Sequence, residues 1–109
     1  MTTAADRVAL GAALLDEKDP GWWLRIDLDT LALSSSCRCV LGQLCPPEVQ
    51  SAALQDPYFA YAEQLSGRTC SHQDEWAIAR GFTAQGREIT FADLTGEWKR
   101  LIAERRAAA

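Results

Sequence analysis

The stretch from Thr90 to Ile102 constrains the fold more than any other part of this sequence. Thr90 is a good helix cap, and Asp93 stands three residues later, as in a capping box. The apolar residues that follow recur at helical spacing, which predicts an amphipathic helix with one buried face. These residues are Phe91, Leu94, Trp98, Leu101 and Ile102.

Other segments carry similar helix signals. Thr3 and Asp6 form a second capping-box pattern, followed by Val8, Gly11, Ala12 and Leu15 at i, i+3, i+4 and i+7. Asp-Pro pairs at 19–20 and 56–57 can each start a helix. Residues 27–33 partly alternate, but no partner strand is evident. We therefore predict an all-α fold, with residues 1–109 forming a single small domain of five or six short helices with irregular connections.

Charge and hydropathy exclude several classes of partner. The chain has a formal net charge of −4, and residues 1–65 hold nine acidic and four basic residues. Such an acidic half disfavours binding to nucleic acid, although the basic C-terminal end of Lys99, Arg100, Arg105 and Arg106 is a possible exception. No apolar run approaches the ~18 residues of a membrane span, and the N-terminus lacks a signal-peptide pattern. We therefore expect a cytoplasmic protein whose thiols stay reduced.

Several runs together resemble a group of small uncharacterised proteins. That group occurs in phages, prophages and genomes of Gram-positive bacteria, mostly actinobacteria. The resemblance covers about half the chain and implies a phage or prophage setting, with no particular activity. It is carried by Leu14-Leu15-Asp16-Glu17-Lys18, Pro20-Gly21-Trp22-Trp23, Ile26-Asp27-Leu28-Asp29 and Ser36-Cys37-Arg38-Cys39-Val40-Leu41-Gly42-Gln43-Leu44, and resumes at Gly81-Phe82 and from Leu94 to Ile102.

Three of the four cysteines gather between residues 37 and 45, and they suggest a metal site. Thiolate and imidazole are the ligands that zinc prefers, so Cys37, Cys39, Cys70 and His72 form a candidate zinc set. The spacing lacks the C-x2-C pattern typical of zinc sites. A helix capped by Ser36 would place Cys45 about 12 Å from Cys37 along its axis, too far to share one ion.

Two other interpretations of the cysteines stay open. Cys37, Val40, Leu41 and Leu44 share helical spacing, which would make Cys37 an ordinary core residue. A thiol in the first turn of a helix beside Arg38 could instead be reactive, with His72 as its base. The acidic cluster Asp16, Glu17, Asp19, Asp27 and Asp29 matches no calcium loop, and we interpret it as helix caps and solvated surface.

The adjacent tryptophans Trp22 and Trp23 must point in different directions on a helical segment. Either could therefore be an exposed anchor for another protein, although core packing of all the tryptophans is the alternative. The leading hypothesis is a small cytoplasmic protein of phage or prophage type that binds a host or phage protein through Trp22 and Trp23 and has no catalytic activity. The alternative hypothesis is a zinc- or thiol-dependent binding module built on the cysteine and histidine set.

Overall fold

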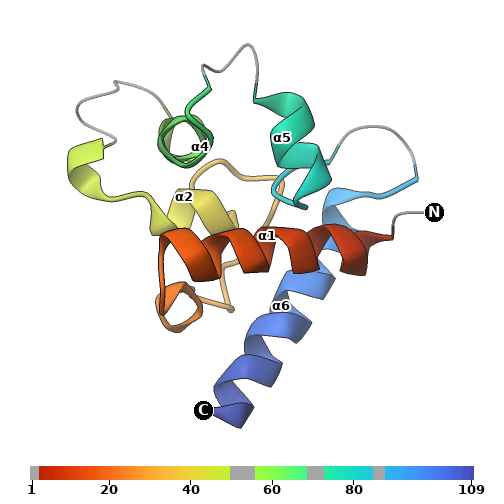
Figure 1. Cartoon of the computed structure of the whole chain (residues 1–109). Coiled ribbons are helices and arrows are strands. Elements are labelled where there is room, and N and C mark those ends of the chain that lie inside the picture. Colours follow the sequence, from red (N-terminus) through yellow and green to blue (C-terminus); the bar gives the residue numbers. More distant parts are fainter. Residues whose placement is uncertain (1–2, 50–55, 69–72, 85–87) are drawn as a thin grey trace.

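The computed structural model describes residues 3–49, 56–68, 73–84 and 88–109. Within these ranges the chain forms helices and turns and contains no strand (Figure 1). The predicted all-α fold is therefore confirmed. The helices are α1 (Ala4–Lys18), the 3-10 helix η1 (Trp22–Leu24), α2 (Val40–Leu44), α4 (Pro57–Ser66), α5 (Asp74–Ala79) and α6 (Phe91–Ala108). None of the helices in these ranges has the length and apolar character to cross a lipid bilayer.

Helix α1 begins as its sequence predicts. The Thr3 side chain accepts a hydrogen bond from the backbone of Asp6, and the Asp6 carboxylate accepts one from the backbone of Thr3, so the capping box is complete. The expected stripe is buried, but Leu10 is 57% exposed and does not widen it. The buried residues of α1 are Val8, Gly11, Ala12 and Leu15.

Helix α6 also begins with the predicted capping box, between Thr90 and Asp93. Its buried stripe consists of Leu94, Trp98 and Ile102. Phe91 was expected in that stripe but is 37% exposed, because it occupies the first turn, where α6 has not yet reached the core.

Trp98 is the centre of the core. Its ring stacks on Phe82 at a centroid distance of 5.6 Å and meets the edge of Trp22 at 5.5 Å. Its Nε1 donates a 2.7 Å hydrogen bond to the Gly81 carbonyl, so the one polar atom of this buried side chain is satisfied. Trp76 adds a fourth aromatic ring against Phe82. Aromatic packing therefore links η1, α5 and α6.

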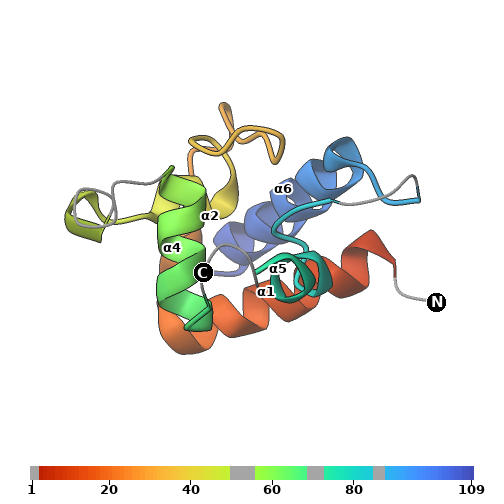
Figure 2. The same ribbon diagram turned by 90° about the horizontal axis from the view of Figure 1, so that it is seen from above.

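The crossing of α1 and α6 depends on Gly11 (Figures 1 and 2). A Cβ at this position would lie 2.1 Å from the Arg80 carbonyl oxygen and 2.9 Å from the Trp98 ring. Only a residue without a side chain therefore lets the Arg80 backbone and the Trp98 ring approach α1 this closely. Next to it, Gly81 closes α5 with a φ of +68°, a conformation that side chains other than glycine rarely adopt.

Helices α4 and α5 lie over α1 (Figure 2). Pro57 starts α4 as expected, and Gly67 ends it with a left-handed φ of +71°. Tyr58 and Leu65 of α4 are only partly buried. Gln73 precedes α5; Ser71, which has the sequence spacing of a capping box with Asp74, lies outside the described residues. The residues that face the core from α4 are Pro57, Ala60, Tyr61 and Ala62.

Arg105 and Arg106, at the basic C-terminal end of α6, bind groups in the N-terminal part of the chain. Arg105 forms an ion pair with Asp16 and lies over the Trp22 ring, while the Trp22 Nε1 donates to the same carboxylate at 3.0 Å. The hydrogen bonds from Arg105 hold the pKa of Asp16 below its ordinary value of 3.8. Arg106 donates to the Trp23 carbonyl oxygen at 2.9 Å. These cations therefore have intramolecular partners and do not form a free basic surface.

We predict that Gly11→Ala destabilises the protein by about 1–3 kcal/mol, although alanine is the better helix former by roughly 1 kcal/mol. The new methyl group would collide with the Arg80 backbone, which has no flexible end to move aside. The matched control is Gly96→Ala on α6, where an added Cβ meets nothing within 4 Å. Urea denaturation should show a loss of stability for the first variant and a gain for the second. Equal effects of the two would contradict this account of the crossing.

Asp16→Asn should cost about 0.5–1 kcal/mol at pH 7, since it removes the charge that Arg105 contacts in two places. The folded-state pKa of Asp16 is lowered, so its stabilisation is complete above the ordinary value of 3.8 and disappears as the pH falls through the lower, folded value. The difference between wild type and variant in urea denaturation should therefore shrink below about pH 4. Asp29→Asn, at an exposed position, should show a much smaller difference at every pH.

Candidate functional site

The cysteine segment folds differently from the prediction. Helix α2 begins at Val40, three residues later than a helix capped by Ser36 would, because Cys39 is its cap. The Cys39 sulfur accepts a hydrogen bond from the backbone N–H of Gly42 at 3.2 Å. The Ser35 hydroxyl accepts from the backbone of Cys37 and Arg38, which holds the preceding residues in a turn. Cys37 therefore lies outside α2, and the separation of Cys37 and Cys45 predicted for one continuous helix does not apply.

This geometry separates the two cysteines of the C-x-C pair. Cys37 is exposed, so the expectation that it packs in the core is wrong; the turn places it on the surface. Cys39 is 2% exposed, and burial raises the pKa of its thiol to about 11. The thiol also lies 3.7 Å from the Ser36 carbonyl oxygen, to which it donates. Cys39 is therefore a protonated structural thiol at neutral pH and not a nucleophile.

The candidate zinc set is only partly visible. Cys70 and His72 lie outside the described residues, so their distance from Cys37 and Cys39 is not defined. Among the residues that the structure describes, no three or more of the side chains that bind metals gather closely enough to hold an ion. The four-residue zinc site stays a prediction.

The tryptophans occupy different environments. Trp22 has no exposed surface and packs against Trp98, so it belongs to the core and cannot contact a partner in this conformation. Trp23 is only partly buried and lies against the edge of the core. Of the two predicted anchors, Trp23 alone has surface available to a partner. We therefore withdraw Trp22 as a partner-binding residue.

The acidic cluster is largely engaged in structural contacts. Asp16 binds Arg105 and Trp22. Asp19 accepts a 2.6 Å hydrogen bond from the Tyr61 hydroxyl and pairs with Arg25. The Asp27 carboxylate accepts from the backbone two residues later. These contacts agree with the interpretation of the cluster as caps and surface residues.

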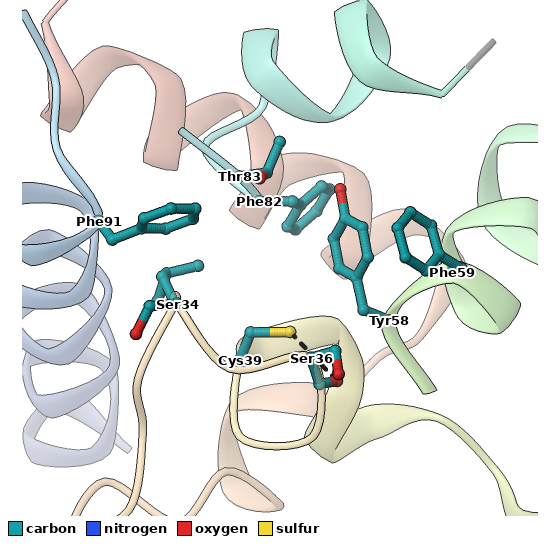
Figure 3. A pocket seen from close by; sticks show the side chains of 9 residues that line it. Ser34, Ser36, Cys39, Tyr58, Phe59, Phe82, Thr83 and Phe91 are labelled. Atoms are coloured by element: carbon teal, nitrogen blue, oxygen red, sulfur yellow. Dashed lines mark hydrogen bonds between the residues drawn. The ribbon is translucent and has the colours of Figure 1, made fainter. Parts of the chain in front are cut away.

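An apolar pocket that the sequence analysis did not predict lies beside the cysteine turn, and we name it the Phe59–Phe91 pocket. Its volume is about 160 Å³. In Figure 3, Phe91 approaches the open space from α6, and Tyr58 and Phe59 approach it from α4 on the opposite side. The described residues that line it are Leu33, Ser34, Ser36, Cys39, Tyr58, Phe59, Phe82, Thr83 and Phe91.

The pocket is built from four separate parts of the chain. The backbone N–H of Leu33 donates to the Thr95 hydroxyl at 3.0 Å, and that hydroxyl donates to the Phe91 carbonyl oxygen at 2.8 Å. These bonds hold the turn before α2 against the start of α6. The stacking of Phe82 on Trp98 fixes the inner wall. On the α4 side of the pocket, the rings of Tyr58 and Phe59 pack against each other, with 5.0 Å between their centroids.

The described part of the pocket lining carries no charge at physiological pH. Its titratable side chains among the described residues are Cys39 and Tyr58. Burial raises the pKa of Tyr58 to about 12, as it raises that of Cys39 to about 11. Neither side chain is therefore a ready general base near pH 7. The arrangement suits an uncharged, largely apolar group, with the hydroxyls of Ser34 and Ser36 beside it for polar contacts, while the Thr83 side chain hydrogen-bonds to Tyr58.

The signal for this pocket was weak in the sequence. No motif pointed to Phe59, and the helical spacing placed Phe91 in the core stripe of α6. An aromatic residue in the first turn after a helix cap is a hint of exposure, because the first turn of a helix often precedes its contact with the core.

No family model, curated protein or solved structure matches the chain.

We predict that Cys37 reacts with iodoacetamide at pH 8 at least about tenfold faster than Cys39, because Cys37 is exposed, whereas burial shields the Cys39 thiol from the reagent and raises its pKa to about 11. Trypsin cleavage after Arg38 separates the two cysteines, so tandem mass spectrometry can follow each one. In urea the difference should disappear. Equal labelling rates in the folded protein would contradict the buried, capping role of Cys39.

Proposed function

We propose that this chain is a small helical protein that binds another protein by receiving one of its apolar side chains in the Phe59–Phe91 pocket. The observation that carries the proposal is the pair of half-exposed phenylalanines, 36% and 37% exposed, on opposite sides of the opening. Exposed aromatic side chains around a pocket are typical of binding hot spots, since they exclude water around an inserted group.

The dimensions of the pocket support a single side chain as the occupant. A cavity of about 150 Å³ lined by apolar residues is large enough for a benzene ring. The Phe59–Phe91 pocket has a similar volume of about 160 Å³, and its described lining combines four aromatic rings with Ser34, Ser36 and Thr83.

The chemistry of the lining supports binding without catalysis. The two titratable side chains of the described lining are both protonated at neutral pH, as their raised pKa values require. A charged ligand would lose its hydration there without gaining an opposite charge. An apolar group loses no such hydration and gains contact with four aromatic rings.

The setting that we propose is the bacterial cytoplasm during phage or prophage expression, with a host or phage protein as the partner. The resemblance of the runs around Trp22, Cys37 and Gly42 to proteins of Gram-positive phages supports this setting. Trp23, which is partly buried, is available for a secondary contact.

A displayed library of random peptides, selected on the folded protein, should enrich sequences around one large apolar residue. Phe59→Ala and Phe91→Ala should each weaken the selected peptides by tenfold or more, because each removes one side of the opening. Leu24→Ala is the matched control, since Leu24 is 63% exposed and does not line the pocket. The proposal fails if selection gives no binder, or if the peptides bind the phenylalanine variants as tightly as the control.

A further inference from the structure

A second surface feature, lined by other residues than the Phe59–Phe91 pocket, lies where α1 meets the end of α5. It is a groove of about 280 Å³, which we name the α1 groove. Leu10, the most exposed large apolar residue of α1, stands at its edge with 57% of its surface exposed. The lining residues are Leu10, Ala13, Leu14, Glu17, Ala79 and Arg80.

The residues along this face of α1 follow a second stripe beside the buried one; in this stripe Leu10 is exposed, and Leu14 is partly buried against the core. Arg7, Leu10, Leu14 and Glu17 are spaced by three, four and three residues, which is the a/d spacing of a paired helix. The two leucines are in the middle, and opposite charges stand at the two ends. Neither Arg7 nor Glu17 forms an ion pair in the part of the chain that the structure describes.

This order of residues is complementary to itself in the antiparallel direction. If a second α1 lies antiparallel across the stripe, with the two-fold axis at the level of Ala12, residues whose numbers sum to 24 face each other. Leu10 then faces Leu14 of the second copy, and Arg7 faces Glu17 of the second copy. Both contacts occur twice because a two-fold interface uses the same patch on each subunit.

We propose that the α1 groove is the interface of a two-fold homodimer, in which antiparallel α1 helices pack Leu10 against Leu14 and pair Arg7 with Glu17. The occupant is a second copy, since the opposite charges lie at equal distances of five residues from the centre of the stripe, as a self-complementary surface requires. One helix face and its groove form a small interface, so we expect a dissociation constant of ~10–100 µM. This inference does not rest on the proposed function of the Phe59–Phe91 pocket.

Charge reversal tests the pairing directly. Arg7→Glu leaves acid at both ends of the stripe, and Glu17→Arg leaves base at both ends. Each variant alone should be monomeric at concentrations where the wild type dimerises, because like charges then face each other twice. A mixture of the two variants should form a heterodimer, because every facing pair is then of opposite charge. Sedimentation velocity of the full chain from ~10 µM to ~1 mM measures all three cases.

The controls separate association from folding. Within one chain, Arg7 and Glu17 are ten residues apart, about 15 Å along the helix, so they cannot pair with each other. Acid near the start of α1 and base near its end both suit the helix dipole, so each variant should melt no lower than the wild type. Leu10→Glu should also give a monomer. The inference is overturned if the wild type is monomeric at ~1 mM, if the single variants still dimerise, or if mixing them restores no dimer.

Discussion

The interaction on which the rest of this structure depends is the close contact of Trp98 with two glycines. Gly11 admits the Trp98 ring and the Arg80 backbone to within a few ångströms of α1. Gly81 adopts a left-handed conformation, and its carbonyl oxygen accepts the hydrogen bond from the indole. The Trp98 ring occupies the space that the two glycines leave open because they lack side chains. Helices α1, α5 and α6 can therefore meet at one point with the polar atom of the ring satisfied.

The pocket is a consequence of this packing. Phe82 follows Gly81 directly, is held flat against Trp98 and also lines the pocket, where it forms the inner wall. Phe91 stands at the start of α6, before the buried stripe of that helix begins, and so extends past the core. The same packing that makes the core compact therefore leaves an aromatic opening at its border.

Local signals in the sequence predicted the helix starts well. The capping boxes at Thr3 and Thr90 and the proline at residue 57 act within one helical turn, so neighbours in the chain are sufficient to define them. Local signals failed at Cys37, where helical spacing suggested a core residue. The Ser35 hydroxyl and the Cys39 sulfur instead hold a turn that delays α2, and Gly42 lets the Ser36 carbonyl pack against the new helix.

The sequence by itself determined that the fold is all-α, where α1, α4 and α6 begin, and that α1 and α6 each present one apolar face to the core. Those properties follow from spacing and capping, which depend on residues three or four positions apart. Only the tertiary structure decided that Trp22 is buried, that Arg105 is paired with Asp16, and that Phe59 and Phe91 border one pocket. These facts join residues between 32 and 89 positions apart in the chain. They are set by how the helices pack around Trp98, which no local pattern encodes.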